Sequence, residues 1–218
     1  MLNFLKRNKY QPKLTYGITV CNEWMELKQL LIVLTENIDV EDEILVLKDS
    51  SIESNEVERV LEEFKNKVKV IFYPLEGNFA TFKNNLITEA TKDYLFQIDA
   101  DEEPKISLIR EIKEYLKKNK KNDVFNVPRI NIVQGITPQH IGKWGWKIDE
   151  NNYINFPDYQ QRIFKLNKGI VWKNKVHECL YGFNKQKYMP IDTTDFCLIH
   201  KKNIIKQEQQ NSFYDTLT

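Results

Sequence analysis

Cysteine and glycine are scarce in this sequence. Its three cysteines, Cys21, Cys179 and Cys197, are odd in number and show no CxxC spacing, which argues against a disulfide framework and a zinc site. We expect reduced, mostly buried thiols and a cytoplasmic protein. The 7 glycines form neither a G-x-G-x-x-G nor a G-x-x-x-x-G-K-[ST] motif, so the sequence has no classical dinucleotide site and no P-loop.

A dominant charge and a long apolar run are also missing. The 32 basic and 31 acidic residues leave a net charge of +1, which gives no compositional support for nucleic-acid binding. No apolar run approaches the ~18 residues of a membrane span. The N-terminus becomes polar by Lys6 and Arg7, unlike a secretory signal. A frayed terminus and a basic arm that touches a membrane surface both remain open.

The first half of the chain alternates strand-like and helix-like patterns. Such alternation at short spacing predicts right-handed crossovers and a mostly parallel sheet covered by helices on both faces. Ligands bind such sheets at the carboxyl ends of the strands, here after Val20, Leu47, Tyr73 and Ile98. The expected strands are 14–20, 43–47, 68–73 and 94–98, and the expected helices are 24–34, 55–64, 79–90 and 106–118.

The second half is less regular. We expect a strand over 123–132 that Pro128 interrupts, a long loop over 134–158, and a hairpin that joins 161–166 to 170–173. A late strand over 196–199 and a terminal helix over 204–217 follow. The predicted organisation is an arm (1–12), one domain (13–203) with halves 13–103 and 104–203, and a C-terminal helix (204–218).

An acidic motif, Asp99-Ala100-Asp101, directly follows the apolar strand that ends at Ile98. Residues two apart in an extended chain point to the same side, so both carboxylates can share one divalent cation. Oxygen ligands suit magnesium or manganese, which also bind substrate phosphates. A solvated turn that continues into Glu102 and Glu103 is the alternative. The position next to a buried strand favours a functional role, since an unpaired carboxylate is costly there.

Several segments in order resemble the family-two glycosyltransferases of the GT-A fold. They are Ile18–Glu23, Glu43–Ser51, Asn78–Ile87 and Tyr94–Glu102. Two later segments, Gln161–Lys165 and Val171–Glu178, resemble a subgroup that includes bacterial lipopolysaccharide-core glucosyltransferases. The resemblance covers roughly residues 13–202 and implies an α/β GT-A fold with a central, mostly parallel sheet flanked by helices.

The resemblance also implies roles for individual residues. It places a nucleoside pocket at the end of the first strand, a base or ribose contact at Asp49, and a cationic contact at Lys83. It places metal and ribose contacts in the acidic motif, with Asp101 as the principal metal ligand. The implied nucleotide-sugar site comprises Val20, Cys21, Asn22, Glu23, Asp49, Lys83, Asp99, Ala100, Asp101 and Arg162.

Two residues depart from the family pattern. Lys48 stands where the family often has Asp or Asn, and Lys83 replaces the usual Arg. Lysine is a point charge rather than a bidentate fork, so the contacts at the base end differ from the usual ones. Arg162, which is followed by the apolar residues Ile163 and Phe164, is assigned to the nucleotide-sugar site, with a purely structural ion pair as the alternative.

Glu178 is the candidate general base, because inverting transfer needs a carboxylate to take the proton of the acceptor hydroxyl. A structural ion pair with Arg162 or a lysine is the alternative role for Glu178. Asp149, Glu150 and Asp158 are rivals for the base.

His200 follows an apolar strand. The resemblance makes it a third metal ligand beside Asp99 and Asp101, and a surface histidine is the alternative. A group of aromatic residues in the long loop is a candidate acceptor platform or a plug at the core edge. These are Trp144, Trp146, Tyr153, Phe156 and Tyr159.

The predicted function is metal-dependent, inverting transfer of a hexose from a nucleotide diphosphate sugar, UDP-glucose or another UDP-hexose. The acceptor is a hydroxyl on a glycan or glycoconjugate, as in polysaccharide biosynthesis, and the cofactor is Mn²⁺ or Mg²⁺. A non-catalytic nucleotide- or carbohydrate-binding protein on the same fold is the alternative, and a scaffolding protein that binds no nucleotide is a third hypothesis.

Overall fold

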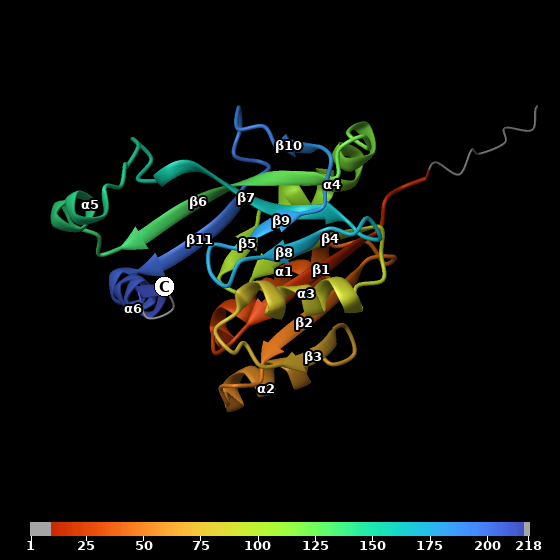
Figure 1. The fold of residues 1–218 in the computed structure, drawn as a ribbon, viewed down its shortest axis with the longest axis horizontal. Helices are drawn as coiled ribbons and strands as arrows, with labels where there is room; N and C mark the ends of the chain where they lie inside the picture. Colours follow the sequence, from red (N-terminus) through yellow and green to blue (C-terminus); the bar gives the residue numbers. More distant parts are fainter. Residues whose placement is uncertain (1–9, 216–218) are drawn as a thin grey trace, which may run out of the picture.

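The computed structural model describes residues 10–215, and its centre is a nine-stranded sheet (Figure 1). The strand order is β3-β2-β1-β4-β7-β6-β11-β5, and β10 pairs with β6. Residues 1–9 of the predicted N-terminal arm (1–12), which carry the hypothesis of membrane contact, lie outside the described residues. Within residues 10–215, no helix has the length and apolar character that a membrane crossing requires.

The first half has the predicted alternation. The strands β1, β2, β3 and β4 pair in parallel. Ser54 accepts a hydrogen bond from Val57 N, so it caps the helix that begins at Asn55. Asn78 caps the next helix in the same way. The elements are β1 (Leu14–Val20), α1 (Trp24–Asn37), β2 (Glu43–Asp49), α2 (Asn55–Glu63), β3 (Lys69–Tyr73), α3 (Phe79–Glu89) and β4 (Tyr94–Asp99).

The second half contains more strands than its sequence pattern predicted. β7 is antiparallel to both of its neighbours, β4 and β6, and β8 and β9 form a separate two-stranded sheet. The elements are β5 (Glu102–Pro104), α4 (Ile106–Lys118), β6 (Val124–Gln134), α5 (Pro138–Trp144), β7 (Ile154–Lys165), β8 (Val171–Lys173), β9 (Cys179–Tyr181), β10 (Gln186–Tyr188), β11 (Leu198–Asn203) and α6 (Ile204–Asp215).

Several expectations for the second half differ from the structure, in the type of element or in its bounds. Residues 134–158 are not a single loop, because α5 begins at Pro138 behind a capping box of Thr137 and His140, and β7 begins at Ile154. Residues 161–166 and 170–173 form no hairpin, since β7 pairs with β4 and β6 whereas β8 pairs with β9. The strand expected over 196–199 begins at Leu198 and extends to Asn203.

Pro128 does not interrupt β6. It lies between the part of the strand that pairs with β10, up to Asn126, and the part that pairs with β11, from Arg129. A residue without an N–H is therefore placed where the ladder on that side changes partner.

Apolar side chains alternate between the two faces of the sheet and form two clusters. Ile44, Val46 and Phe96 belong to the cluster under α1, α2 and α4. Leu45 and Leu95 belong to the cluster under α3, β8 and β9. Strands buried on both faces are typical of parallel sheets with helices on each side. This packing fixes the carboxyl ends of β1, β2 and β4 at one edge of the sheet.

The three thiols differ in burial. Cys197 is buried and Cys21 is partly buried, but Cys179 is exposed, so the expectation of mostly buried thiols is wrong for Cys179. The cause is its place on β9, which pairs with β8 alone and shows alternate residues to solvent.

Candidate active site

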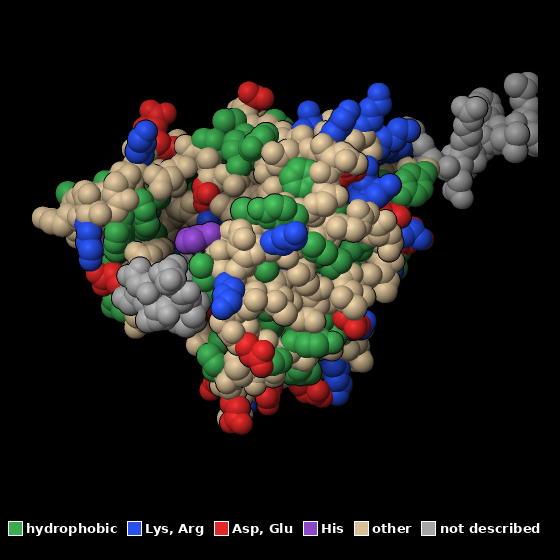
Figure 2. Space-filling view, in the orientation of Figure 1, with side chains coloured by type: hydrophobic (Ala, Val, Ile, Leu, Met, Phe, Trp, Pro, Cys, Tyr) green, Lys and Arg blue, Asp and Glu red, His purple; other side chains and the backbone are tan. Residues whose placement is uncertain are grey.

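A cleft of about 750 Å³ opens at the carboxyl ends of β1, β2 and β4 and extends over β6 and β7. Figure 2 shows the surface hollowed between the part that carries α5 and the body of the molecule. Asn22, Asp149 and Glu150 do not line this cleft. The predicted residues that do line it are Val20, Cys21, Glu23, Asp49, Lys83, Asp99, Ala100, Asp101, Asp158, Arg162, Glu178 and His200.

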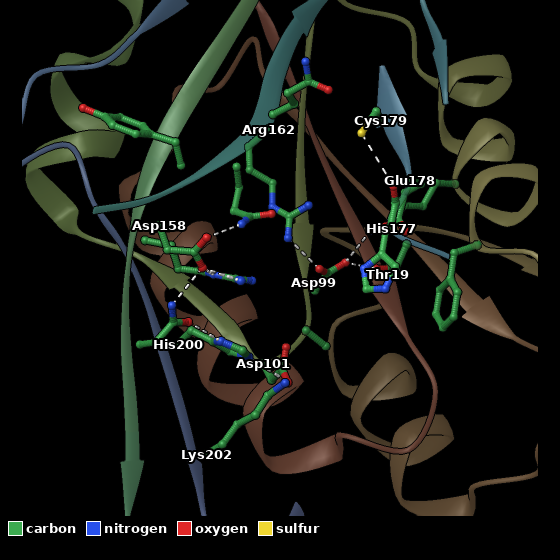
Figure 3. A pocket seen from close by; sticks show the side chains of 18 of the residues that line it. Thr19, Asp99, Asp101, Asp158, Arg162, His177, Glu178, Cys179, His200 and Lys202 are labelled. Atoms are coloured by element: carbon green, nitrogen blue, oxygen red, sulfur yellow. Dashed lines mark hydrogen bonds and ion pairs between the residues drawn. The ribbon is translucent and has the colours of Figure 1, made fainter. Parts of the chain in front are cut away.

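Asp99 ends β4 in the floor of the cleft and is heavily hydrogen-bonded (Figure 3). Its Oδ1 accepts from Thr19 Oγ1 at 2.7 Å and from Gln97 Nε2 at 3.0 Å, and its Oδ2 accepts from Arg162 Nη2 at 2.7 Å. Burial alone would raise the pKa of Asp99, but the charges of Arg162 and Lys83 outweigh it and hold the pKa well below its usual range. Asp99 is therefore ionised.

Glu102 is a buried carboxylate between two arginines. Its Oε1 accepts from Arg129 Nη1 at 2.8 Å and from Arg162 Nη2 at 2.7 Å, and its Oε2 accepts from Arg162 Nε at 3.0 Å. Burial alone would raise the pKa of Glu102, but the charges of Arg162 and Arg129 outweigh burial and lower the pKa below its usual value. Glu102 is therefore also ionised. Arg129 continues the network to Asp158, whose Oδ2 accepts from Nη2 at 2.6 Å.

Asp101 turns away from Arg162 toward the other wall of the cleft (Figure 3). Its Oδ2 lies 3.3 Å from His200 Nε2 and 3.4 Å from Lys202 Nζ. Burial would raise the pKa of Asp101, but the hydrogen bond and charge of His200 and the charge of Lys202 lower it well below its usual range. This carboxylate carries its negative charge throughout the neutral pH range.

The orientation of His200 is set by Asn131. Asn131 Nδ2 donates to Asp158 Oδ2 at 2.8 Å, so the amide oxygen of Asn131 faces His200 Nδ1, also at 2.8 Å. An oxygen can only accept, so His200 Nδ1 carries the hydrogen and Nε2 faces Asp101. Metal-binding histidines usually have this arrangement, in which one ring nitrogen donates a hydrogen bond to an oxygen and the second nitrogen is left for the metal.

These residues fit a divalent cation that is shared with a phosphate ligand. Among residues 10–215, no three or more His, Cys, Asp and Glu side chains converge into a complete cage. Asp101 and His200 instead offer one oxygen and one nitrogen donor at the cleft surface. Magnesium and manganese at nucleotide sites use one or two protein carboxylates and take their other ligands from water and phosphate. Both oxygens of Asp99 already accept hydrogen bonds, one of them from Arg162, so Asp99 has less capacity to bind a metal than the sequence predicted.

Asp49, at the end of β2, leaves an acceptor free. Its Oδ1 accepts from the backbone N–H of Ser51 at 2.9 Å and of Leu75 at 3.0 Å. Its Oδ2 is buried and has no hydrogen-bond partner within residues 10–215, although the weakly donating thiol of Cys21 lies near the carboxylate. Buried polar atoms are normally paired, so this oxygen is suited to an N–H from a ligand.

Lys48 does not face the cleft. Its ammonium donates to the backbone carbonyls of Asp49 and Ile52 and holds the loop after β2. The departure from the family pattern at this position therefore affects the loop that carries Asp49 rather than a direct ligand contact.

Glu178 stands on the wall opposite Asp101, directly before β9 (Figure 3). Its Oε1 accepts from the buried ammonium of Lys83, which also lies 3.4 Å from Asp99 Oδ1 and 5.4 Å from the centre of the Trp172 ring. Lys83 thus bridges the two carboxylates. His177, before Glu178, has φ of 52°, a left-handed conformation that is uncommon for a residue with a side chain.

The other candidates are distributed differently. Asp158 lines the cleft but is held by Arg129 and Asn131, so its carboxylate is already occupied. The predicted aromatic platform is not one cluster but three. Trp144 packs on Trp146 with ring centroids 4.6 Å apart, Tyr153 packs on Phe156 at 5.7 Å, and Tyr159 packs on Tyr188 at 4.9 Å.

Sequence reasoning missed Arg129, Asn131 and the role of Glu102. Arg129 and Asn131 line the cleft, and Glu102 is buried. Strand pairing brings residues far apart in the sequence together here, as in the Arg129 to Glu102 bond that joins positions 27 apart. The one signal in the sequence was the place of Arg129 and Asn131 at alternate positions of a strand, where both side chains point to the same face.

Comparisons with known proteins match this geometry. The model of glycosyl transferase family 2 matches residues 15–202. Among solved structures, S. aureus TarS 1-349 is similar, with a TM-score of 0.60 at 14% identity over 87% of this chain and 60% of that one. Its complex with UDP-GlcNAc gives a TM-score of 0.61 at 15% identity over 87% of this chain and 58% of that one. No curated protein matched by sequence.

The fold and the charged cleft define a glycosyltransferase domain of the GT-A type, as the sequence predicted. The chain belongs to glycosyl transferase family 2. It spans at most 60% of the length of the TarS structures that it resembles. The likeness to the lipopolysaccharide-core subgroup stays a prediction.

Proposed function

We propose that this chain transfers a hexose from a UDP-sugar to an acceptor hydroxyl, with inversion at the anomeric carbon and with Mn²⁺ or Mg²⁺ as cofactor. The observation that carries the proposal is the Asp101 carboxylate, which faces His200 in a cleft whose floor also holds Lys83 and Arg162. A metal cation bound to a diphosphate brings charges of both signs into the cleft. Ionised carboxylates compensate the positive charge of the metal, and the lysine and arginine side chains compensate the negative charge of the diphosphate.

The nucleoside end lies between β1 and β2. Asp49 Oδ2 accepts an N–H from the base, for which the imide of uracil is suited. Glu23 Oε2 accepts from the backbone N–H of Cys21 at 2.9 Å and of Asn22 at 3.1 Å and thereby fixes the turn after β1. S. aureus TarS was crystallised with UDP-GlcNAc and with UDP, and the likeness in fold favours a UDP-sugar here.

Asp101 and His200 would hold the cation, which would supply positive charge to the diphosphate leaving group. Arg162 and Glu102 orient Asp99, which is placed toward the ribose and the cation. Lys202, 3.4 Å from Asp101 Oδ2, adds positive charge on the diphosphate side. These charges act in a partly closed cleft, where they are worth more than in water.

Glu178 acts as the general base. The acceptor oxygen forms a bond to the anomeric carbon, the bond from that carbon to the diphosphate breaks, and the proton of the hydroxyl passes to Glu178. In the ligand-free chain Lys83 is paired with Glu178. A bound diphosphate competes for the Lys83 ammonium and frees the carboxylate when the donor is present.

The acceptor is a glycan or glycoconjugate, and we place the reaction in cytoplasmic polysaccharide biosynthesis, because the three cysteines are free thiols. The test is a screen of UDP-sugars with manganese and candidate acceptors, in which released UDP and product mass are measured. Release of UDP with one donor supports the proposal. Binding of UDP and manganese without release from any donor supports the non-catalytic alternative, and absence of binding in a thermal shift assay contradicts both.

A further inference from the structure

One end of the cleft is lined by uncharged polar side chains in a row across three strands. Tyr188 on β10 is in register with Asn126 on β6, and Asn126 is in register with Gln161 on β7. Paired positions on neighbouring strands point to the same face, and all three residues line the cleft together with Gln186. We call these four residues the amide row.

The amide row is held together by its own hydrogen bonds. Asn126 Nδ2 donates to Gln186 Oε1 at 3.1 Å, and Gln161 Nε2 donates to the same oxygen at 3.4 Å. Gln161 Oε1 accepts from the backbone N–H of Leu180 at 2.7 Å, which ties the row to β9, two positions beyond Glu178. The row is therefore anchored beside the candidate base.

Several polar atoms of the row remain available to a ligand. Asn126 is 4% exposed, yet its Oδ1 takes part in no hydrogen bond recorded for residues 10–215. The same holds, in that part of the chain, for Gln186 Nε2 and for the hydroxyl of Tyr188, whose side chain is exposed. The row thus offers an amide acceptor, an amide donor and a phenol that does both.

Cations are absent from the row itself. The arginines of the cleft, Arg129 and Arg162, are paired with Asp158, Asp99 and Glu102. Lys187 lies between Gln186 and Tyr188 in β10, and alternation along the strand directs it to the other face, outside the cleft lining. A carboxylate or phosphate placed on this row would be desolvated beside Glu178 without a counter-charge.

We propose that the amide row is the acceptor subsite and that it binds an uncharged sugar, a hexose or N-acetylhexosamine unit rather than a uronic acid or a sugar phosphate. The inference rests on the proposed function, because it takes Glu178 as the base. The hydroxyls of a neutral sugar match the free donors and acceptors of the row. The ring of Tyr188, packed edge-on against Tyr159 at 4.9 Å, gives an apolar face for the sugar ring.

The test uses two probes that differ only at carbon 6, p-nitrophenyl β-glucoside and p-nitrophenyl β-glucuronide. Saturation-transfer NMR on the full chain measures binding of each probe without nucleotide and with UDP plus manganese. We expect the glucoside to bind at least roughly tenfold more tightly than the glucuronide, since the acid loses hydration and gains no partner. Equal binding, tighter binding of the glucuronide, or no binding of either probe would overturn the proposal.

Two exposed positions locate the binding. Gln186→Ala and Tyr188→Ala should each weaken glucoside binding about tenfold by removing a hydrogen bond or the ring contact. Tyr181→Ala, on the exposed side of β9 and outside the cleft lining, is the matched control and should change nothing. Gln186→Lys should strengthen glucuronide binding, because it supplies the missing cation. Unchanged glucoside binding in both alanine variants would contradict the proposal.

The measurement with UDP and manganese distinguishes a failure of this inference from a failure of the proposed function. Titration of the same samples with UDP and manganese reports on the other end of the cleft. If the glucoside binds and UDP does not, the proposed function fails while the uncharged subsite stands. If UDP binds and the glucoside does not, the subsite fails alone.

Discussion

Residues 10–103 and residues 104–203 contribute to the cleft in different ways. In the first part the functional carboxylates lie at the carboxyl ends of strands, as Asp49 does in β2 and Asp99 in β4. In the second part they lie within strands or between them, as Arg162 does inside β7 and His200 inside β11. The first part supplies Asp99 and Asp101, and the second supplies Arg162 and His200, which contact them, together with the candidate base Glu178.

The positions of the functional side chains are determined locally in the first part and by contacts far apart in the sequence in the second part. Parallel strands with helical crossovers bring their carboxyl ends to one edge whatever the details of the loops. The Arg162 bond to Asp99 spans 63 positions, and the His200 contact with Asp101 spans 99, so both depend on correct pairing of β6, β7 and β11. Substitutions in the two parts should therefore have different effects. Those in the first part should lower the rate of the reaction, and those in the second part should disturb the position of the functional groups or lower the stability of the fold.

The largest effect is expected at Asp101. Asp101→Asn removes the charge that faces His200 and should reduce UDP release from the preferred donor by about 10³-fold, the scale seen when one preorganised electrostatic group is lost. Kinetics of UDP release measure this, with Asp192→Asn on the exposed surface as the control. Activity within threefold of the unchanged chain would show that the acidic motif does not act on the donor.

Glu178→Gln should reduce transfer by about 10²–10³-fold, because the amide cannot take the proton of the acceptor. UDP affinity, measured by calorimetry, should not fall, because Glu178→Gln removes the carboxylate that competes with the diphosphate for the Lys83 ammonium. Glu150→Gln, at an exposed rival outside the cleft, should leave transfer intact. Full activity of the Glu178 variant would move the role of base to another acid.

Glu102→Gln tests the positioning part of the comparison. It leaves Arg129 and Arg162 without their shared buried carboxylate, which should cost about 3–5 kcal/mol of unfolding free energy. Thermal or urea unfolding measures the loss. A loss below about 1 kcal/mol, the scale of a surface ion pair, would contradict the assigned role.

The same variant has a signature in pH. The pKa of Glu102 is lowered in the folded chain, so its contribution is present above the unfolded value of about 4.3 and is lost as the pH falls through the folded value. The difference in unfolding free energy between the chain and Glu102→Gln should be constant near neutral pH and should narrow below about pH 4. A difference in unfolding free energy that grows as the pH falls would contradict a lowered pKa of Glu102 in the folded chain.

Asn131→Ala should weaken Mn²⁺ binding about 10–100-fold in the presence of UDP, because His200 loses the acceptor that fixes its Nδ1 hydrogen. Electron paramagnetic resonance of free Mn²⁺ measures the affinity. Asn184→Ala, on the exposed surface, is the matched control. Affinity equal to that of the control would remove Asn131 from the metal site.

The smallest effect concerns the thiols. Burial, followed by the charge of Glu23, raises the pKa of Cys21 to about 11, and burial raises that of Cys197 to about 11. Cys179 is exposed and should react with iodoacetamide at pH 8 at least roughly tenfold faster than the other two. Peptide mass mapping over time checks the order, and Cys179→Ser should remove the fast phase. Fast alkylation of Cys21 would contradict the closed geometry of the nucleoside end.

Much of the first part was predictable from the sequence. Apolar strands buried on both faces and amphipathic helices give two distinct periods, so β1 through β4, the helices between them and α4 were placed within a few residues. The short strand β5 was not predicted. Asp99 and Asp101 were found because they leave a buried strand, and Asp49 and Lys83 because their segments resemble the family.

The second part was predicted less well for physical reasons. β7 begins inside a stretch rich in Asn, Pro and aromatic residues, and its strand character comes from pairing with β6 and β4 rather than from local pattern. Glu102 looked like one more acid in a solvated run, since its burial between two arginines is decided by strands far away in the sequence. Asn131 gave no signal beyond its place two positions after Arg129 in the same strand.

The most direct test of the account is a crystal structure with UDP and manganese, with the metal located by its anomalous signal. The account predicts one manganese peak between the diphosphate and the side chains of Asp101 and His200, with the base of UDP within hydrogen-bond distance of Asp49 Oδ2. UDP bound elsewhere, or a manganese peak distant from Asp101, would contradict it.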